Sequence, residues 1–401
     1  MKKYLVGGAV RDLILKRQNN DKDYVIVGSS FDEMLSLGFK SVGKSFPVFI
    51  HEKYEGEFAL ARTEKKSGKK HFDFECFTKD VSLEEDLKRR DLTINAIAYD
   101  EKSGEFIDPF GGLEDIKNKI LRPTSEAFKD DALRILRAAR LKTELGGGWE
   151  FDKILSDYAF DMREELGELS KERIYKETKK ALYAQNSSVF FYSLLSLGAL
   201  KILFPYLDDL TKISHENEYH KEGSVFVHTM MALDLCSDTT AKWAVLFHDI
   251  GKYQSFAEDG NFHRHYDEKI VKSAFREIEK TLSLSREEFE IAKFFALKHH
   301  KLQNIFKNSM RISKTAALLF SIKDKKRLKI ILEAVLADLK GRIGKSADFI
   351  FSKEQVIEMW QLLKCADYGV DNKTMNVMQI KSIIAHKQAN ILKEFIKNIT
   401  N

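Results

Sequence analysis

The spacing of hydrophobic and polar residues changes character near Pro123. Before this proline, short apolar runs alternate with glycine- and proline-rich turns, a pattern typical of short strands and helices. We predict strands at residues 25–27, 48–50, 58–60 and 72–76, and helices near residues 8–17, 31–37 and 82–89. After Pro123, apolar residues recur at helical spacing, as in residues 132–141. The chain is therefore predicted to be α+β, with an N-terminal head containing a mixed sheet, followed by an all-α body.

Several regions are expected along the chain. Residues 1–140 are predicted to form the head, residues 141–214 a helical neck or body, and residues 215–345 a separate module. Residues 346–401 are predicted to form a C-terminal helical segment. The third region is set apart by its histidines, which cluster from residue 215 to residue 300.

Composition limits the class of protein. A chain of 401 residues, 43% of them hydrophobic, is long enough for sizeable cores. A net charge of +5 permits a polyanionic partner without requiring one. The three cysteines have no CxxC spacing, which argues against a disulfide framework or a thiolate zinc site. The apolar run at the N-terminus ends early at Arg11, and no stretch approaches a membrane span. We expect a cytoplasmic protein with no membrane partner.

Two acidic residues near the N-terminus carry the clearest chemistry. Asp21 and Asp23 follow the turn Gly7-Gly8, and alternate residues of a strand point the same way. Magnesium prefers oxygen ligands and binds through one or two carboxylates together with substrate phosphates. Backbone N–H groups of a glycine turn suit a triphosphate, and Arg11 follows closely. This arrangement predicts metal-assisted nucleotidyl transfer.

A second polar cluster lies in the segment 89–99, with Arg90, Asp91 and Asn95. An arginine gives fixed donors for phosphate or ribose oxygens, and the aspartate and asparagine can bind a sugar hydroxyl or orient the arginines. The alternative is a charged helix end leading into a core strand. The neighbouring glycine turn and paired carboxylates favour the nucleotide-binding interpretation.

A third cluster contains Asp131 and Arg134, with Arg137 one turn further. On a helix the first two residues share a face. Cytosine and adenine each carry an exocyclic amine beside a ring nitrogen acceptor, so a carboxylate and an arginine can read both bases. Uracil and guanine reverse that pattern. The alternative is an ordinary surface ion pair at i, i+3, which is the commoner meaning of this spacing.

Taken together, these motifs resemble the bacterial tRNA nucleotidyltransferases. These are CCA-adding enzymes of the class II polymerase β-like nucleotidyltransferases, and this chain is similar to the subgroup with a C-terminal HD domain. The resemblance extends to about Arg342. It is carried by residues 7–12, 21–23, 57–68, 86–98, 108–112, 130–134 and 172–177.

The resemblance implies a polymerase β-like head and a role for each matched residue. Asp21 and Asp23 would be catalytic and hold Mg²⁺, with Gly8 and Arg11 at the triphosphate. Further nucleotide contacts are implied for Arg90, Asp91, Asn95, Asp131, Arg134 and Arg137. The implied reaction adds CCA to the 3′ end of tRNA from CTP and ATP, by two-metal transfer and without a nucleic-acid template. The pair Glu172-Arg173 fits the family's neck motif, which supports the base-reading helix.

The histidine-rich module resembles the HD metal-hydrolase superfamily. Its order His…His-Asp…Asp is matched by His228, His248, Asp249 and Asp338. Such a set suits Mn²⁺, Mg²⁺, Ni²⁺ or similar ions. The histidines at positions 263, 265 and 299 are further candidates for a second site or for phosphate contacts. The implied activity is metal-dependent phosphohydrolysis, including 2′,3′-cyclic phosphodiesterase and phosphatase chemistry.

Two other functions remain open. An enzyme that adds only A to tRNA, or a bacterial poly(A) polymerase, would share the same head. Alternatively, the chain is an HD phosphohydrolase whose head binds RNA without catalysis. The sequence does not determine the oligomeric state.

Overall fold

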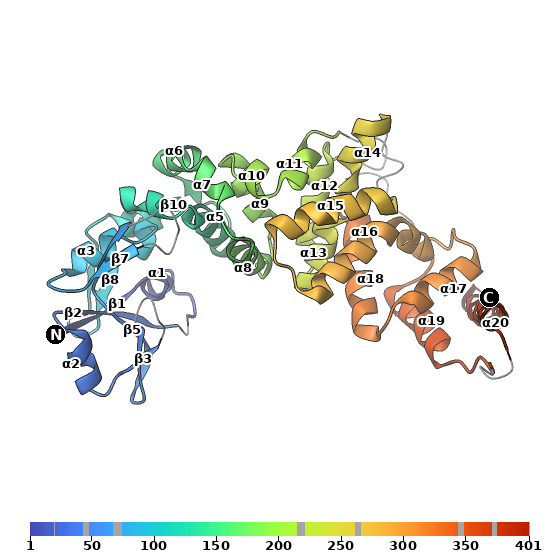
Figure 1. Ribbon diagram of the computed structural model, residues 1–401, viewed down its shortest axis with the longest axis horizontal. Coiled ribbons are helices and arrows are strands. Elements are labelled where there is room, and N and C mark those ends of the chain that lie inside the picture. The colour runs from blue at the N-terminus through green and yellow to red at the C-terminus, as the bar shows by residue number, and fades with distance from the viewer. Residues whose placement is uncertain are drawn as a thin grey trace. The chain divides into compact units, whose positions relative to one another are not determined.

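The computed structural model describes residues 1–19, 21–42, 48–66, 74–214, 221–260, 266–343, 349–370 and 375–400 (Figure 1). The chain divides into two compact units. Unit 1 consists of Met1–Glu177 and Tyr192–Ile202, and unit 2 consists of Thr178–Phe191 and Leu203–Asn401. The boundaries predicted from the sequence describe smaller domains, and they stay a prediction.

Unit 1 contains all the strands of the described residues. They are β1 (Lys2–Val6), β2 (Asp23–Val27), β3 (Lys40–Val42), β4 (Val48–His51), β5 (Tyr54–Leu60), β6 (Thr63–Lys66), β7 (Phe74–Phe77), β8 (Ala98–Asp100), β9 (Glu105–Ile107), β10 (Ile120–Leu121) and β11 (Glu150–Phe151). The helices of this unit are α1 (Gly8–Ile14), α2 (Phe31–Ser36), α3 (Leu83–Lys88), α4 (Gly112–Asn118), α5 (Leu133–Leu145), α6 (Lys153–Asp161) and α7 (Arg163–Gly167), with the 3₁₀ turns η1 (Thr93–Asn95) and η2 (Glu126–Asp130).

A seven-stranded sheet forms the centre of the head, in the order β3-β4-β5-β2-β1-β8-β9. β2 and β5 run parallel and the other neighbouring strands run antiparallel, so the predicted mixed sheet is confirmed. Apolar side chains such as Val6, Val25 and Leu87 pack into one buried cluster. The predicted strand at 72–76 is described from Phe74 onward. β1 is not among the predicted strands, because its exposed lysines shorten the apolar run to three residues.

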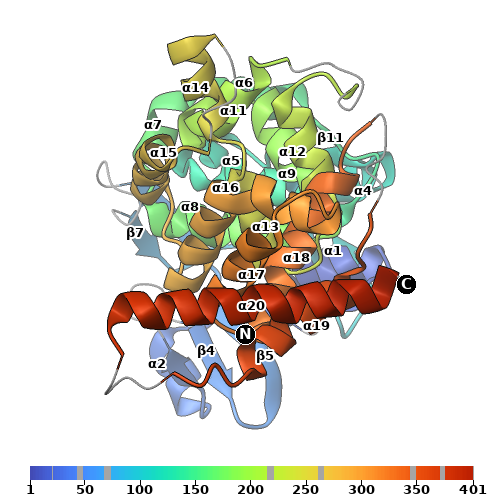
Figure 2. The same cartoon turned by 90° about the vertical axis from the view of Figure 1, so that its right-hand side faces the viewer.

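α8 (Lys171–Leu182), α9 (Ser188–Ser196) and α10 (Leu200–Leu203) contribute residues to both units. The remaining helices belong to unit 2, which has no strand among its described residues. They are α11 (Pro205–Thr211), α12 (Val225–Asp234), α13 (Thr239–Phe247), α14 (Gly251–Asp259), α15 (Glu268–Thr281), α16 (Arg286–Phe306), α17 (Ile312–Ser321), α18 (Lys325–Lys340), α19 (Lys353–Cys365) and α20 (Val377–Thr400). Figure 2 shows α20 lying across α17 and α19.

Helix α13 lies at the centre of unit 2. Every residue from Ala241 to Phe247 is buried, so this helix is covered on all sides. The one charged residue among them is Lys242, whose ammonium donates to Leu182 O, Ala184 O and Ser187 Oγ at 2.7–2.9 Å. These acceptors satisfy all three donors of the ammonium, which makes the burial of its charge tolerable. The helix that precedes His248 is therefore held firmly in place.

Candidate active sites

The pairing of β1 with β2 brings the glycine turn beside an acidic residue. Val6 pairs with Asp23, and Gly7 follows Val6 at the start of α1. A Cβ placed on Gly7 would lie 3.2 Å from Arg90 Nη1 and 3.8 Å from Asp23 Oδ2. We call the set Gly7, Gly8, Arg11, Asp21, Asp23 and Arg90 the N-terminal cluster.

Asp21 lies just before β2, which begins at Asp23. The described strand does not include Asp21, so strand alternation does not by itself place this residue, and the alignment of the two side chains stays a prediction. The N–H of Asp21 donates to Asn19 Oδ1 at 2.9 Å. The pKa of Asp23 is raised by partial desolvation, lowered by the charge of Arg90, and raised again by the charge of Asp21. The two carboxylates thus interact electrostatically. Coordination of one metal ion by both of them stays a prediction.

The side chain of Arg11 is fixed by two partners. Its Nε and Nη2 donate to the two oxygens of Asp12 at 2.9 and 3.0 Å, and its Nη1 donates to Asn95 Oδ1 at 2.9 Å. Asn19 Nδ2 also donates to Asp12 Oδ2 at 2.8 Å, so the side chain of Asn19 is bound to the same carboxylate. Gly8 begins α1, and a Cβ there would lie 3.5 Å from Arg11 Nη2.

Asp91 and Asn95 belong to the same hydrogen-bond network. Asp91 Oδ1 accepts from the N–H of Leu92 and from Asn95 Nδ2, and its Oδ2 accepts from Arg137 Nε at 2.8 Å. Burial would raise the pKa of Asp91, but the charge of Arg137 and the bond from Asn95 outweigh it and hold the pKa well below its usual range. Arg137 is therefore an ion-pair partner of a buried carboxylate.

Asp86 organises the arginines of this region, although no role is predicted for it from the sequence. It is fully buried, and it accepts from Arg89 Nη2 at 2.7 Å, from Arg90 Nη2 at 3.1 Å and from the N–H of Arg62 at 3.2 Å. Arg90 Nε is buried and has no hydrogen-bond partner among the described residues. The spacing of Asp86 to the two arginines, three and four residues at the end of α3, is the signal that could have found it.

The base-reading pair has a different geometry from the one predicted. α5 begins at Leu133, and Asp131 lies before it in an extended conformation, so Asp131 and Arg134 do not form a pair along one helix face. Asp131 Oδ1 accepts the N–H of Leu133, and its Oδ2 accepts from Arg173 Nη2 at 2.6 Å. The side chain of Asp131 thus bonds to the backbone of a neighbouring residue, an interaction that competes with helix formation.

Arg134 is held by main-chain carbonyls. Its Nη1 donates to the carbonyls of Ala127 and Arg90 at 3.0 and 3.4 Å, and its Nη2 donates to that of Arg89 at 2.8 Å. These bonds take three of the five N–H groups of a guanidinium. Burial lowers the pKa of Arg134, and the charges of Asp91 and Asp131 oppose that effect. Asp131 and Arg134 are thus each fixed by other partners.

A further carboxylate next to Asp23 is absent from the sequence-based predictions. The parallel register of β2 and β5 sets Glu57 directly beside Asp23, so both side chains leave the same face of the sheet. Sequence spacing gives no signal for this neighbour, because strand pairing alone brings the two residues together.

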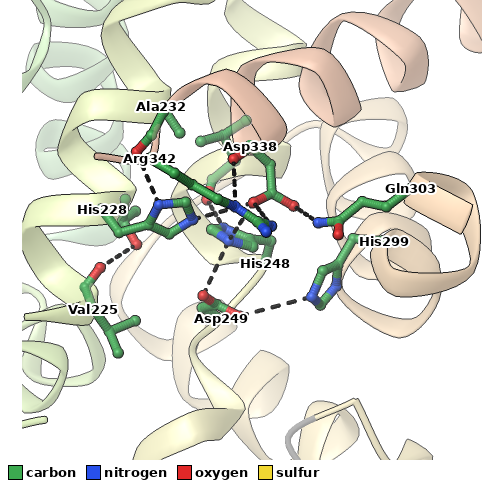
Figure 3. Close-up of polar contacts among 12 residues, drawn as sticks. Val225, His228, Ala232, His248, Asp249, His299, Gln303, Asp338 and Arg342 are labelled. Carbon is green, nitrogen blue, oxygen red and sulfur yellow. Dashed lines mark hydrogen bonds and ion pairs between the residues drawn. The ribbon is translucent and has the colours of Figure 1, made fainter. Parts of the chain in front are cut away.

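The second cluster lies in unit 2 and is shown in Figure 3. His228 comes from α12, His248 and Asp249 follow α13, and Asp338 comes from α18. All four side chains are buried. Ligand atoms of His228, His248 and Asp249 lie within 4.8 Å of one another, and Asp338 Oδ1 lies 3.1 Å from His228 Nε2. We call these four residues the HD cluster.

Backbone carbonyls set the orientation of the histidine rings. Nδ1 of His228 donates to Gly341 O at 3.0 Å, and Nδ1 of His248 donates to Val245 O at 2.6 Å. Each Nε2 is thereby turned toward the carboxylates, the arrangement found for histidines that bind metals. His248 Nε2 is buried and lacks a hydrogen-bond partner among the described residues, although Asp249 Oδ2 lies 3.1 Å away. A cation between these atoms would satisfy both, so the residues fit a divalent metal.

Electrostatics agree with a cation in this position. Burial alone would lower the pKa of His228, but its hydrogen bonds with Asp338 and Glu222 outweigh burial and raise the pKa to about 9. The same excess of negative charge that favours a proton on this ring favours a metal ion, so the two compete for Nε2.

Helix α16 adds two buried groups to the HD cluster. His299 donates from Nδ1 to Ala296 O at 3.2 Å, and its Nε2 lies 3.7 Å from Asp249 Oδ1. Gln303 donates to Asp338 Oδ2. His299 therefore has the ring orientation of the two HD histidines. The candidates at positions 263 and 265 lie outside the described residues.

Comparisons with known proteins match two family models, both within the first 211 residues of the chain. The Poly A polymerase head domain matches residues 3–122, and a probable RNA and SrmB-binding site of polymerase A matches residues 159–211. The multifunctional CCA protein of Shewanella denitrificans is 37% identical, over 98% of this chain and 100% of that protein. That of Shewanella frigidimarina is 40% identical, over 92% and 90%. This chain belongs to the multifunctional CCA protein family.

Solved structures of CCA-adding enzymes share the fold. A complex with ATP has a TM-score of 0.62 at 21% identity and covers 99% of this chain and 91% of that one. The Thermotoga maritima enzyme complexed with tRNA has a TM-score of 0.60 at 17% identity and covers 99% and 90%. The predicted α+β class with a polymerase β-like head is confirmed. Within the described residues, no helix has the length and apolarity needed to cross a membrane.

One glycine of this family member sets the distance between two HD ligands. A Cβ on Gly341 would lie 2.7 Å from both Cα and N of Ala232, so the end of α18 packs directly on the backbone of α12. This contact brings Asp338 to His228. We expect Gly341→Ala to lower the free energy of unfolding by about 1–3 kcal/mol through overpacking, and to weaken metal binding.

Urea unfolding and a metal titration test this prediction. The matched control is Gly167→Ala, since Gly167 lies in α7 and a Cβ added to it would meet nothing within 4 Å. This control is expected to be neutral or slightly stabilising. Equal stability of the two variants would contradict the role given to Gly341.

Proposed function

We propose that this chain adds CCA to the 3′ end of tRNA, using CTP and ATP without a nucleic-acid template. The observation that carries the proposal is the N-terminal cluster within a chain that matches multifunctional CCA proteins over nearly its whole length. Structures of CCA-adding enzymes with ATP and with CTP have the same fold. tRNA is the proposed acceptor, because the Thermotoga maritima enzyme of this fold forms a complex with tRNA.

The proposed metal ligands are Asp21 and Asp23, with Glu57 beside them. When bound, magnesium would lower the pKa of the attacking 3′-hydroxyl and stabilise charge on the reacting phosphate. The backbone at Gly7 faces this position, and Arg90 supplies a cation next to it. Arg11, fixed by Asp12 and Asn95, is assigned to the triphosphate.

Base selection is assigned to Asp131 and Arg134. Asp131 keeps lone pairs for an exocyclic amine in addition to its bonds with Leu133 and Arg173. Arg134 makes three carbonyl bonds, and a guanidinium has five N–H groups. Because both groups are fixed by other partners, they are preorganised for the pattern shared by cytosine and adenine. Arg173 and Arg137 act as positioning residues.

We further propose that the HD cluster binds one divalent transition metal or Mg²⁺ and hydrolyses phosphate esters, including 2′,3′-cyclic phosphates. When bound, the ion would polarise the phosphate and activate a water. His228, His248, Asp249 and Asp338 supply its ligands, and His299 is a further candidate. The name "multifunctional" of the relatives fits a second activity.

Incorporation on tRNA lacking its 3′ CCA tests the main proposal. With CTP alone we expect two nucleotides to be added, with ATP alone none, and with both the complete CCA end. Good use of ATP without any use of CTP would instead select an A-adding enzyme or a poly(A) polymerase. A protein that binds the tRNA but incorporates neither nucleotide would contradict both.

A further inference from the structure

Two cationic side chains occupy the carboxylate oxygens on which the proposed metal site depends. Lys252 Nζ lies 2.7 Å from Asp249 Oδ2, and Arg342 Nη2 lies 3.2 Å from Asp338 Oδ1. These are the same oxygens that lie 3.1 Å from His248 Nε2 and from His228 Nε2. Figure 3 shows Arg342 reaching across the histidine rings to Asp338.

Both cations are anchored close to the HD cluster. They lie three and four residues along the chain from Asp249 and Asp338, and their side chains are only 12% and 19% exposed. Arg342 Nε also donates to Asp338 O at 3.2 Å. The preceding carbonyl, Gly341 O, accepts from His228, so the backbone at this point is fixed by a ligand histidine.

The charges explain why two cations are retained there. Once the histidines are neutral, as metal binding requires, Asp249, Asp338 and the buried carboxylate of Glu222 carry three negative charges against the two positive charges of Lys252 and Arg342. A divalent ion would change the net charge of these groups from negative to positive in a largely buried site. An uncompensated buried charge is costly, so binding of an anion would stabilise the metal-loaded site.

We propose that Arg342 and Lys252 form a phosphate-binding site beside the HD metal. This inference rests on the metal site and phosphohydrolase activity proposed above. The metal takes over the oxygens of Asp249 and Asp338, and the two side chains, still tethered beside it, donate to the oxygens of a phosphate group. A guanidinium suits this role because its fork can bond two phosphate oxygens. The ligand class is a phosphate ester, and metal binds before it.

A purely structural role for Arg342 predicts the opposite pattern of binding. If the arginine served only to hold Asp338 in place, its removal would loosen that carboxylate and weaken metal binding. The affinity of the loaded site for phosphate would stay the same. The two roles are therefore separated by measuring metal and phosphate binding independently.

Calorimetry on the full-length protein tests the proposal. Mn²⁺ alone is titrated into the wild type, Arg342→Gln and the control Lys340→Gln, which removes one exposed positive charge from the end of α18. Inorganic phosphate is then titrated at saturating Mn²⁺. We expect Arg342→Gln to bind Mn²⁺ as tightly as the wild type or more tightly, and to bind phosphate about tenfold or more weakly. The control is expected to match the wild type in both titrations.

Weaker Mn²⁺ binding with unchanged phosphate binding in Arg342→Gln would overturn the proposal, as would a Mn²⁺-loaded wild type that binds no phosphate. Hydrolysis of a 2′,3′-cyclic nucleotide is measured in parallel. Phosphate binding that depends on Arg342, without hydrolysis by the wild type, would support the binding site and refute the hydrolase function. Hydrolysis by the wild type, with phosphate binding that does not depend on Arg342, would support the hydrolase function and refute the phosphate-binding site.

Discussion

Replacing Asp23 by asparagine is expected to reduce incorporation of CTP and ATP into tRNA by at least about a thousandfold. The substitution keeps the shape of the side chain and removes the charge that would bind magnesium. Asp23 lies opposite Val6 in the β1–β2 register and next to the glycine turn, so no other described carboxylate has the same neighbours. Initial rates on tRNA lacking CCA, at saturating magnesium, measure the effect.

The control for this variant is Asp32→Asn, an exposed carboxylate in the first turn of α2. It has the same chemical change and the same effect on net charge, and we expect an unchanged rate. Binding of tRNA to Asp23→Asn is expected to match the wild type, because phosphate contacts depend on basic residues. Retention of more than about a tenth of the wild-type rate in Asp23→Asn would refute the metal assignment.

Replacing Asp249 by asparagine is expected to lower hydrolysis of 2′,3′-cyclic nucleotides by at least about a hundredfold and to leave CCA addition within about twofold of the wild type. Asp249 is buried, and its two oxygens face His248 and His299. An amide is a poor ligand for a transition metal in comparison with a carboxylate. Assays of both activities on one preparation, together with bound metal per chain, measure the outcome.

Asp234→Asn serves as the control for the HD variant. Asp234 lies in α12, where its carboxylate accepts from the N–H and hydroxyl of Ser188, and it is not an HD ligand. We expect it to keep both activities and the full metal content. If Asp249→Asn loses CCA addition as well, the two activities are not independent. If all activity depends on Asp249 and none on Asp23, the chain is a phosphohydrolase with an RNA-binding head.

The N-terminal cluster shows how far motifs alone can lead. The order of residues predicts that Gly7, Gly8 and Asp23 act together, and the β1–β2 register brings the glycine turn beside Asp23. Strand alternation does not explain the place of Asp21, because the strand begins after it. Glu57 could not be found in this way, since only the pairing of β2 with β5 sets it beside Asp23.

The base-reading residues show where spacing misleads. Asp131 and Arg134 are three residues apart, yet Asp131 lies in an extended conformation before the helix, and Arg173 is its ion-pair partner. The partners of Arg134 are main-chain carbonyls. Every residue has a carbonyl, so residue types in the sequence do not predict these contacts. The HD residues are easier to predict, because an apolar helix ending in His248 and Asp249 is a local signal.

Residue order alone was enough to establish the α+β class, the family, and the acidic and histidine residues that are candidates for the chemistry. Those features depend on residue type and on short spacings, which the chain order preserves. The partners of these residues came only from the folded chain: Asp86 beside the arginines, Arg173 on Asp131, and Arg342 and Lys252 on the HD carboxylates. Strand register and helix packing bring these groups within bonding distance. Neither can be predicted from the spacing of residues along the chain.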